Sequence, residues 1–276
     1  SKMWCKTCNI ETNEELCPIC GSLTIEDLPT EVYWCTHCEV PVIQAATQAD
    51  KGFCPLCAQK MKYLSADLRP VFPEERLLLE LLLGEEPFAY IEKSVWAANS
   101  RYYINGKSVS IPSKIFQDAD TDALSQKLEQ YKNQNTYEYF DKHIARFISA
   151  NQLRLHYLKD EAHAFIKKAA EKFDEEHIVL SFSGGKDSTV TADIVIKALS
   201  NPSLVHIFGD TTLEFPATIE YASRYRENHP LAIFQVAKNR EQVFYDVCED
   251  IGPPARMMRW CCSMFKTGPI TRVINS

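Results

Sequence analysis

The sequence predicts an α/β protein with a parallel sheet near its C-terminus and a cysteine-rich region near its N-terminus. After residue 176, short apolar runs alternate with segments of helical periodicity, as in parallel sheets with helical crossovers. The stretch SFSGGKDST joins one of these runs to a helix-like segment, and its two glycines suit a tight turn. Eight of the eleven cysteines form four Cys-x-x-Cys pairs ahead of residue 58.

These patterns divide the chain into four predicted regions. Residues 1–65 form a double four-cysteine module, and residues 66–120 form a small α+β region with a hairpin. Residues 121–175 form a helical connector. Residues 176–276 form the α/β domain that carries the two glycines, and the length of 276 residues is sufficient for such a division.

Composition limits the class of protein. With 45% apolar and 24% charged residues, the chain has the make-up of a soluble globular protein. No apolar run approaches the roughly 20 residues needed to cross a bilayer, and the start SKMWCKTCN lacks the apolar core of a secretory signal. We therefore expect a cytoplasmic protein with no membrane partner. The formal charge of −7 argues against nonspecific coating of nucleic acid.

Two sets of four cysteines have the spacing of tetrahedral metal sites. The ligand candidates are Cys5, Cys8, Cys17 and Cys20 in one set and Cys35, Cys38, Cys54 and Cys57 in the other. Two-residue spacers let each pair occupy one edge of a tetrahedron, so two Zn²⁺ sites are predicted. Backbone N–H groups of the CPICG and CPLCA turns should point at the thiolates. An iron–sulfur cluster also uses four thiolates, and pairing across the two sets stays open.

The zinc-ribbon-like module is expected to be structural. A region this small buries too little apolar surface to fold alone, so the metal should supply its folding free energy. Residues 1–65 contain five lysines, no arginine and eight acidic residues, so their formal charge is 5 − 8 = −3. This balance disfavours nucleic acid as the partner and favours a protein-docking or lid role.

The middle of the chain predicts a helix, a hairpin and a helical connector. Pro73 suits a first helical position and Gly84 a helix end, and the six leucines between them predict a helix buried nearly all round. Asn105-Gly106 predicts the turn of a β-hairpin. Residues 121–173 read as helical with a break near KNQNT, and apolar residues from Ile144 to Ala169 recur at the spacing of a helix that packs on a sheet.

The segment EHIVLSFSGGKDSTVTADIVIKAL predicts a strand, a loop and a helix, an arrangement that directs helix N-terminal N–H groups at an anion. The two glycines let the backbone approach phosphate oxygens. The lysine adds a positive charge, while the aspartate suits backbone capping or an approach to Mg²⁺. The predicted phosphate-binding residues are Ser181, Ser183, Gly184, Gly185, Lys186, Asp187 and Ser188.

This string matches neither the Walker loop nor the G-x-G-x-x-G fingerprint. Its Ser-Gly-Gly-Lys-Asp-Ser core at a strand–helix junction resembles the pyrophosphate loop (PP-loop) of the adenine nucleotide alpha hydrolases. These include the ATP pyrophosphatases and the phosphoadenylyl-sulfate (PAPS) and adenylyl-sulfate (APS) reductases. The resemblance implies a Rossmann-like parallel sheet that binds an adenine nucleotide, namely ATP, APS or PAPS.

Two later stretches are similar to segments of the sulfonucleotide reductase branch. GDTTLEFPATIEY resembles its Asp-Thr-Gly-x-x-Phe-Pro-x-Thr segment, with Thr212 where many members have Gly. Asp210 and Thr211 would then end the second parallel strand at the carboxyl edge of the sheet, where ligands of open α/β sheets bind. PPARMMRWCCSMFKTGP looks like its Arg-x-Cys-Cys-x-x-x-Lys-x-x-Pro segment.

The resemblance implies roles for the residues of that last stretch. Arg256, Arg259 and Lys266 would contact the sulfate or phosphate groups of the nucleotide. The implied catalytic residues are Lys186, Asp187, Cys261 and Cys262.

The sequence also departs from the family pattern. It has no C-terminal Glu-Cys-Gly type tail, and no cysteine follows Cys262, so an iron–sulfur cluster at Cys261 and Cys262 would need ligands from outside this chain. Three parallel strands are predicted, near residues 178–182, 204–208 and 231–236, whereas the family's sheet has about five. We therefore expect the sequence to be one piece of a longer protein.

Three functions are compatible with these features. The first is a PAPS reductase-family enzyme that reduces a sulfonucleotide or transfers sulfur, with a thiol electron donor or a sulfur carrier protein as its partner and a homo-oligomeric assembly. The second is an ATP-pyrophosphatase-type enzyme that adenylates tRNA or DNA for sulfur insertion, which the acidic balance disfavours. The third is a zinc-ribbon protein that senses a nucleotide or acts as a scaffold without catalysis.

Overall fold

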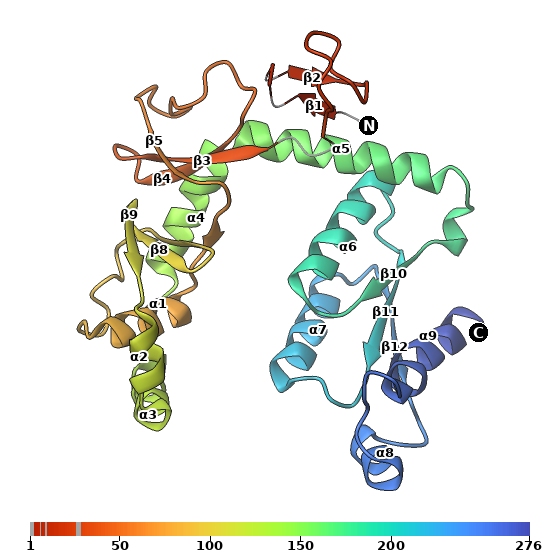
Figure 1. Ribbon diagram of the computed structural model, residues 1–276. Helices are drawn as coiled ribbons and strands as arrows, with labels where there is room; N and C mark the ends of the chain where they lie inside the picture. The colour runs from red at the N-terminus through yellow and green to blue at the C-terminus, as the bar shows by residue number, and fades with distance from the viewer. Residues whose placement is uncertain (1–2, 6, 9, 26–28) are drawn as a thin grey trace. The chain divides into compact units, whose positions relative to one another are not determined.

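The computed structural model describes residues 3–5, 7–8, 10–25 and 29–276 (Figure 1). The chain divides into two compact units, Ser1–His156 and Tyr157–Ser276. Among the described helices, none is both long and apolar enough to cross a membrane. The division of the N-terminal unit at residues 65 and 120 stays a prediction.

The described residues of the N-terminal unit form three small antiparallel sheets, together with helices (Figure 1). Their strands are β1 (Met3–Cys5) with β2 (Ile10–Thr12); β3 (Thr30–Cys35), β4 (Val40–Ala45) and β5 (Lys62–Ser65); and β6 (Arg69–Pro70), β7 (Val95–Ala98), β8 (Arg101–Ile104) and β9 (Lys107–Ser110). The second sheet has the order β4-β3-β5, and the third has the order β6-β7-β8-β9.

The predicted hairpin is confirmed as β8 and β9. Asn105 and Gly106 have φ angles of 46° and 75°, the left-handed conformation that a two-residue turn of this kind needs. A Cβ atom on Gly106 would clash with the indole ring of Trp34, so glycine also provides the space in which this turn packs on strand β3.

The leucine-rich helix is confirmed as α1 (Pro73–Leu83), with Pro73 in its first turn and Gly84 as its left-handed C-cap. The expected burial on all sides is wrong. Leu77 and Leu79 are buried, while the other four leucines are only half-buried. The reason is that one face of α1 packs on the third sheet and carries a buried charged pair, Arg76 and Glu80.

The helical connector is confirmed as four elements. They are α3 (Thr121–Tyr131), a 3₁₀ turn at Lys132–Gln134, α4 (Glu138–Ala150) and α5 (Gln152–Ala170), preceded by the short helix α2 (Ser113–Asp118). The 3₁₀ turn lies at the predicted polar break. At the junction of α4 and α5, the buried Asn151 accepts a hydrogen bond from Ile43 N at 2.7 Å and donates one to Pro41 O at 3.1 Å.

The expected packing of the connector on a sheet is correct for α4 and wrong for α5. Ile144 and Phe147 of α4 pack against the buried Trp34 and Trp96. Every residue of α5 is described, and none of them is buried. The boundary between the two units falls within α5, so only its first turn belongs to the N-terminal unit.

The C-terminal unit is a three-stranded parallel sheet flanked by helices. The predicted strands are confirmed as β10 (Val179–Phe182), β11 (Val205–Asp210) and β12 (Ile233–Lys238), in the order β10-β11-β12. The helices are α6 (Lys186–Leu199), α7 (Pro216–Asn228), α8 (Phe244–Ile251) and α9 (Gly268–Ile274), with a π-helical turn at Cys262–Thr267. Figure 1 shows α6 and α7 on one side of the sheet and α9 on the other.

The core of this unit lies between the sheet and the α6–α7 pair. Phe182 and Phe208 are paired on neighbouring strands and so face the same side of the sheet, and they pack in this core with 1% and 4% of their surface exposed. The opposite face is covered where Ile270 of α9 lies 3.4 Å from the position of a Cβ atom on Gly209. Because the three strands are parallel, their carboxyl ends lie at the same edge of the sheet.

Candidate functional site

The turn between β10 and α6 forms the glycine loop (residues 183–188). Gly184 has a φ of 73°, which is the left-handed region that glycine adopts without strain. Gly185 is the N-cap of α6 and has no side chain to cap the helix. The first N–H groups of α6 therefore face outward without a side-chain cap, and this is the arrangement that binds anions at helix N-termini.

Two serines give the glycine loop its shape. The hydroxyl groups of Ser183 and Ser188 lie 3.1 Å apart, and Ser188 Oγ accepts a hydrogen bond from Ser183 N at 3.2 Å. Ser188 Oγ also donates to Gly185 O at 3.0 Å. The two serines therefore stabilise the conformation of the loop through hydrogen bonds within it. Their sequence-predicted role as direct ligand donors is a proposal.

Helix α7 supports the glycine loop from one side. A Cβ atom on Gly184 would lie 3.2 Å from Cγ2 of Thr218, which is tighter than an ordinary contact. The hydroxyl groups of Tyr221 and Thr189 lie 3.1 Å apart, and Thr189 Oγ1 donates to Gly185 O at 2.9 Å. Sequence reasoning missed Tyr221, although its place two turns into the helix after GDTTLEFPAT was a usable signal.

The other predicted residues of this stretch lie at different places. Lys186 and Asp187 occupy the first turn of α6 and are exposed. Ser181 lies within β10, paired with Ile207 of β11, and is not part of the loop itself. Ser183 and Gly185 therefore belong to the glycine loop, whereas Ser181 lies in strand β10, separated from the loop by Phe182.

Asp210 ends β11 at the same edge of the sheet, as predicted. Its Oδ1 accepts a hydrogen bond from Thr212 N at 2.8 Å, and its Oδ2 lies 2.9 Å from Nζ of Lys238. Lys238 ends β12 and was missed by sequence reasoning, although the carboxyl end of the third strand should have drawn attention. Thr211 donates to Glu214 at 2.9 Å.

Thr212 occupies the position at which many members of the sulfonucleotide reductase branch have glycine. Its backbone conformation explains that preference for glycine. Its φ is 66°, in the left-handed region. A threonine there is strained, but its Oγ1 accepts a hydrogen bond from Phe244 N at 2.9 Å, at the start of α8. The side chain thus gives this chain a contact that glycine could not provide.

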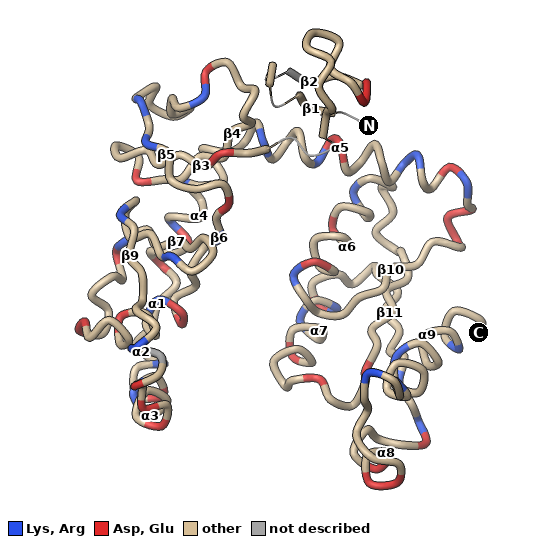
Figure 2. Tube along the Cα trace, in the orientation of Figure 1, with Lys and Arg blue, Asp and Glu red and all other residues tan. Residues whose placement is uncertain are grey.

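The cysteine segment (residues 255–267) returns to the same edge. The buried Trp260 and Phe265 anchor it, and Asn239, just after β12, donates to Met264 O at 3.3 Å. Cys261 and Cys262 are half-buried, and Cys261 packs on that buried cluster together with Cys248. Figure 2 shows the basic positions along the chain between α8 and α9.

The three predicted cations of this segment are unpaired. Arg256, Arg259 and Lys266 are exposed, and no carboxylate of the described residues lies within ion-pair distance of them. Fixed cations at the edge of a sheet can bind phosphate or sulfate groups. Their contact with a ligand remains a prediction.

The two cysteine sets each have the geometry of a mononuclear metal site. Within each set the four sulfur atoms lie within 4.8 Å of one another, so the ligands pair within sets and not across them. Closest sulfur pairs are 3.5 Å (Cys5 and Cys20), 3.6 Å (Cys35 and Cys57) and 3.9 Å (Cys38 and Cys54). Zn–S bonds of about 2.3 Å would place tetrahedral sulfurs about 3.8 Å apart. Each set could therefore hold a metal ion such as zinc.

Hydrogen-bond donors act on single sulfurs of each set, whereas neighbouring sulfurs and burial raise the pKa of Cys8, Cys35 and Cys38. Cys8 N donates to Cys5 Sγ at 3.3 Å, and Cys38 N donates to Cys35 Sγ at 3.4 Å. Hydrogen bonds from Ser22 lower the pKa of Cys20 to about 6. The two backbone contacts lie in the turns at residues 5–8 and 35–38, and not in the CPICG and CPLCA turns for which the sequence predicted them. Hydrogen bonds from Ser22 and Gln59, which directly follow those two turns, lower the pKa of Cys20 and of Cys57 and so favour the thiolate of one sulfur in each set.

Comparisons with known proteins agree with this geometry. Residues 177–276 match the family model described as phosphoadenosine phosphosulfate reductase domain. The uncharacterized protein MJ0066 of Methanocaldococcus jannaschii is 31% identical over 147 residues, which cover 53% of this chain and 30% of that protein. The uncharacterized protein MJ0973 of the same organism is 32% identical over 138 residues, which cover 49% of this chain and 32% of that protein.

The predicted resemblance is thus confirmed for the C-terminal unit. The α/β fold with a three-stranded parallel sheet and the family match together support a nucleotide-binding PP-loop fold for residues 177–276. The chain spans about a third of the length of the curated relatives it matches.

Proposed function

We propose that the C-terminal unit binds an adenine nucleotide with its phosphate or sulfate groups on the glycine loop, and that it reduces a sulfonucleotide or transfers its sulfur. The observation that carries this proposal is the loop itself. Its serines hold it in a fixed conformation, and the uncapped N-terminus of α6 opens at the edge where the strands end.

The charges around the loop support an anionic ligand. Lys186 lies in the first turn of α6, and Arg256, Arg259 and Lys266 are free to contact phosphate or sulfate oxygens. Asp187 is positioned in the same turn, where a carboxylate could approach Mg²⁺ that accompanies the nucleotide.

Cys261 and Cys262 are the proposed thiols for the chemical step. A cysteine thiolate attacks the sulfur of the sulfate group, the bond from that sulfur to the phosphate oxygen breaks, and the nucleoside phosphate leaves. A second thiol, from a thiol electron donor, then attacks the cysteine sulfur. Sulfite leaves and a disulfide forms, so the two thiols lose two electrons and the sulfate sulfur gains them.

Titration calorimetry with ATP, APS and PAPS tests this proposal. We expect saturable binding of at least one nucleotide, and a roughly tenfold or greater loss of affinity in Lys186→Ala. Lys197→Ala is the matched control, because Lys197 lies at the far end of α6 and pairs with Asp193 at 2.7 Å. Absence of binding by all three nucleotides would overturn the proposal.

A second candidate function uses the same loop for ATP. The two four-cysteine sets favour it, because zinc-binding modules can accompany a PP-loop in enzymes that insert sulfur into nucleic acid. ATP would adenylate a carbonyl oxygen of tRNA or DNA, pyrophosphate would leave, and sulfur would replace the activated oxygen. Pyrophosphate release that requires added nucleic acid would select this function over sulfonucleotide reduction.

A further inference from the structure

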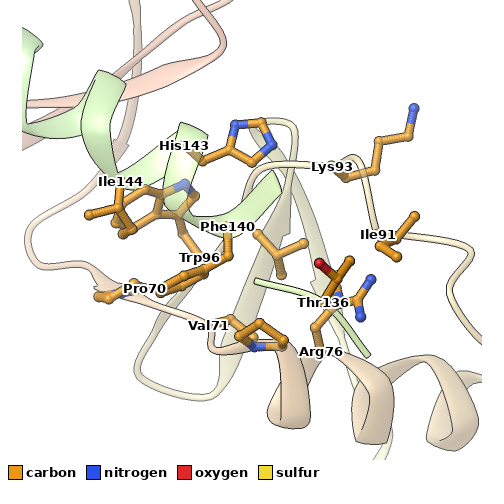
Figure 3. A pocket seen from close by; sticks show the side chains of 12 residues that line it. Pro70, Val71, Arg76, Ile91, Lys93, Trp96, Thr136, Phe140, His143 and Ile144 are labelled. Carbon is orange, nitrogen blue, oxygen red and sulfur yellow. The ribbon is translucent and has the colours of Figure 1, made fainter. Parts of the chain in front are cut away.

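A small cavity in the N-terminal unit takes no part in the proposed function. It lies between the β6–α1 connection, strand β7 and helix α4, and its volume is about 20 Å³ (Figure 3). A cavity needs about 10–15 Å³ to hold one water molecule. It therefore has room for a small polar group and not for a whole nucleotide.

A buried cation lines this cavity. The side chain of Arg76 is 5% exposed, and its Nη2 donates to Asn135 Oδ1 at 2.6 Å. Its Nη1 atom has no hydrogen-bond partner among the residues that the structure describes. A guanidinium group keeps its charge in proteins, so a buried N–H group without a partner carries a substantial free-energy cost.

The neighbouring carboxylate balances the charge of Arg76 but does not accept from Nη1. Glu80 is fully buried, and its two oxygens accept hydrogen bonds from the backbone N–H groups of Phe88 and Tyr90, each at 2.8 Å. The distance from Arg76 Nη1 to Glu80 Oε1 is 3.6 Å, which is too long for a hydrogen bond. Nη1 therefore remains available to a ligand.

The exposed side of the cavity adds a second cation. Lys93 lines the cavity and is exposed, without an ion pair in the described part of the chain. On the flanking segments, the carboxylate of Glu74 accepts a hydrogen bond from the hydroxyl group of Tyr137, and that of Glu92 accepts one from Tyr139. Arg76 and Glu80 compensate each other's charge, and Lys93 places a second cation at the edge of the cavity.

The remaining walls are apolar or neutral. Trp96 and Phe140 line the cavity, and they lower the local dielectric around Arg76 (Figure 3). His143 donates from Nε2 to the carbonyl of Glu92 at 3.1 Å, and its buried Nδ1 is an acceptor without a described partner. Burial also lowers the pKa of His143, so the ring is neutral at pH 7.

From this geometry we propose that the cavity binds a small oxyanion, the carboxylate or phosphate group of a small molecule. The oxyanion accepts from Nη1 of Arg76, and Lys93 attracts it at the entrance. A charge-assisted hydrogen bond in an apolar environment is stronger than the same contact in water. The site is separate from the glycine loop and does not depend on the function proposed for that loop.

Nuclear magnetic resonance of the full chain tests this proposal with sodium acetate and sodium phosphate as probes. The chain has four tryptophans, and Trp96 lines the cavity while Trp260 reports on the C-terminal unit. We expect the Trp96 indole signal to shift saturably with at least one probe, and sodium chloride at equal ionic strength to leave it unchanged. The probe that saturates at the lower concentration identifies the oxyanion as carboxylate or phosphate.

Variants separate this site from the glycine loop. Lys93→Ala should weaken binding about twofold to fivefold, as for an exposed charge, and Arg76→Gln should weaken it roughly tenfold or more. Lys107→Ala, a change of an exposed lysine on the hairpin, and Lys186→Ala should leave the Trp96 titration unchanged. An unmoved Trp96 signal with both probes, or equal affinity in the wild type and Lys93→Ala, would overturn the proposal and leave the cavity as a water site.

Discussion

The glycine loop and the cysteine segment of the C-terminal unit differ in how far their side chains are already engaged. Ser183 and Ser188 hold the glycine loop through internal hydrogen bonds, and Tyr221 supports it through Thr189. The cysteine segment is anchored by buried Trp260 and other apolar residues, but its cations are exposed and unpaired within the described residues. This difference implies that the loop sets the shape of the site, and that the cysteine segment supplies charge and thiols once a ligand is bound.

The largest expected effect is on turnover by the cysteine segment. Cys261→Ser or Cys262→Ser should lower the rate of sulfite release by on the order of 10³-fold, because a serine hydroxyl is a far weaker nucleophile than a thiolate. Nucleotide affinity, measured by calorimetry, should change by less than about twofold, which is about 0.4 kcal/mol of binding free energy. Cys248→Ser is the matched control, since Cys248 packs in the same cluster. If Cys248→Ser lost turnover while Cys261→Ser and Cys262→Ser kept it, the reacting thiol would be Cys248 and not Cys261 or Cys262.

The next largest effect is expected in the glycine loop. Gly184→Val would force a β-branched residue into a φ of 73° and toward Thr218. Strain of about 1–3 kcal/mol, with a steric clash added, should weaken nucleotide binding by roughly 100-fold. Gly252→Val carries comparable strain, with a φ of 86°, but a Cβ atom there meets no described residue within 4 Å, so this change should lower only the melting temperature. Equal affinities of the two variants would mean that the loop does not hold the nucleotide.

A smaller effect is expected for single cations of the cysteine segment. Arg259→Ala or Lys266→Ala should weaken binding by about fivefold to tenfold each, because a partly exposed charge-assisted hydrogen bond contributes about 1–1.5 kcal/mol. Raising the salt concentration should reduce this difference. The control is Arg272→Ala, a change of an exposed arginine on α9. If all three variants bound equally, the cysteine segment would not contact the ligand.

Removing the support from α7 should have a modest effect. Tyr221→Phe deletes the hydroxyl that lies 3.1 Å from Thr189 Oγ1 and keeps the ring. Loss of one neutral hydrogen bond, about 0.5–1 kcal/mol, should weaken nucleotide binding by roughly twofold to fivefold. Calorimetry of Tyr225→Phe provides the comparison, because Tyr225 lies on the same helix but contacts His206. A larger loss in Tyr225→Phe would indicate a general effect of helix packing.

Metal removal should have the smallest effect on either segment. A chelator should unfold the two four-cysteine modules, since metal binding supplies their folding free energy. Both segments belong to the C-terminal unit, so nucleotide affinity should stay within about twofold of its initial value. Circular dichroism and calorimetry on the same sample would check both statements. A fall in affinity on chelation would support a lid role for the cysteine modules.

The elements that local patterns determine could be predicted from the sequence. The glycine loop follows from a strand, two glycines and a helix in succession, and the hairpin turn follows from the conformational freedom of Asn105 and Gly106. The metal sets follow from the spacing of the cysteines.

Contacts between distant elements could not be predicted in the same way. The pairing of Lys238 with Asp210 depends on the order of the strands, and the support from Tyr221 depends on how α7 lies against α6. The buried position of Arg76 on α1 also has no local signal, because two glutamates precede it in the sequence and leucines follow it. The burial expected for α5 failed since helical periodicity does not identify the surface that a helix packs on.

The glycine loop is the proposed site of the nucleotide's phosphate or sulfate groups. Amide hydrogen exchange of the full chain, with and without saturating ATP, APS or PAPS, tests this directly. We predict slower exchange across residues 183–188 and across residues 255–267 when a nucleotide is bound. Unchanged exchange at residues 183–188, with protection elsewhere in the chain, would contradict the account.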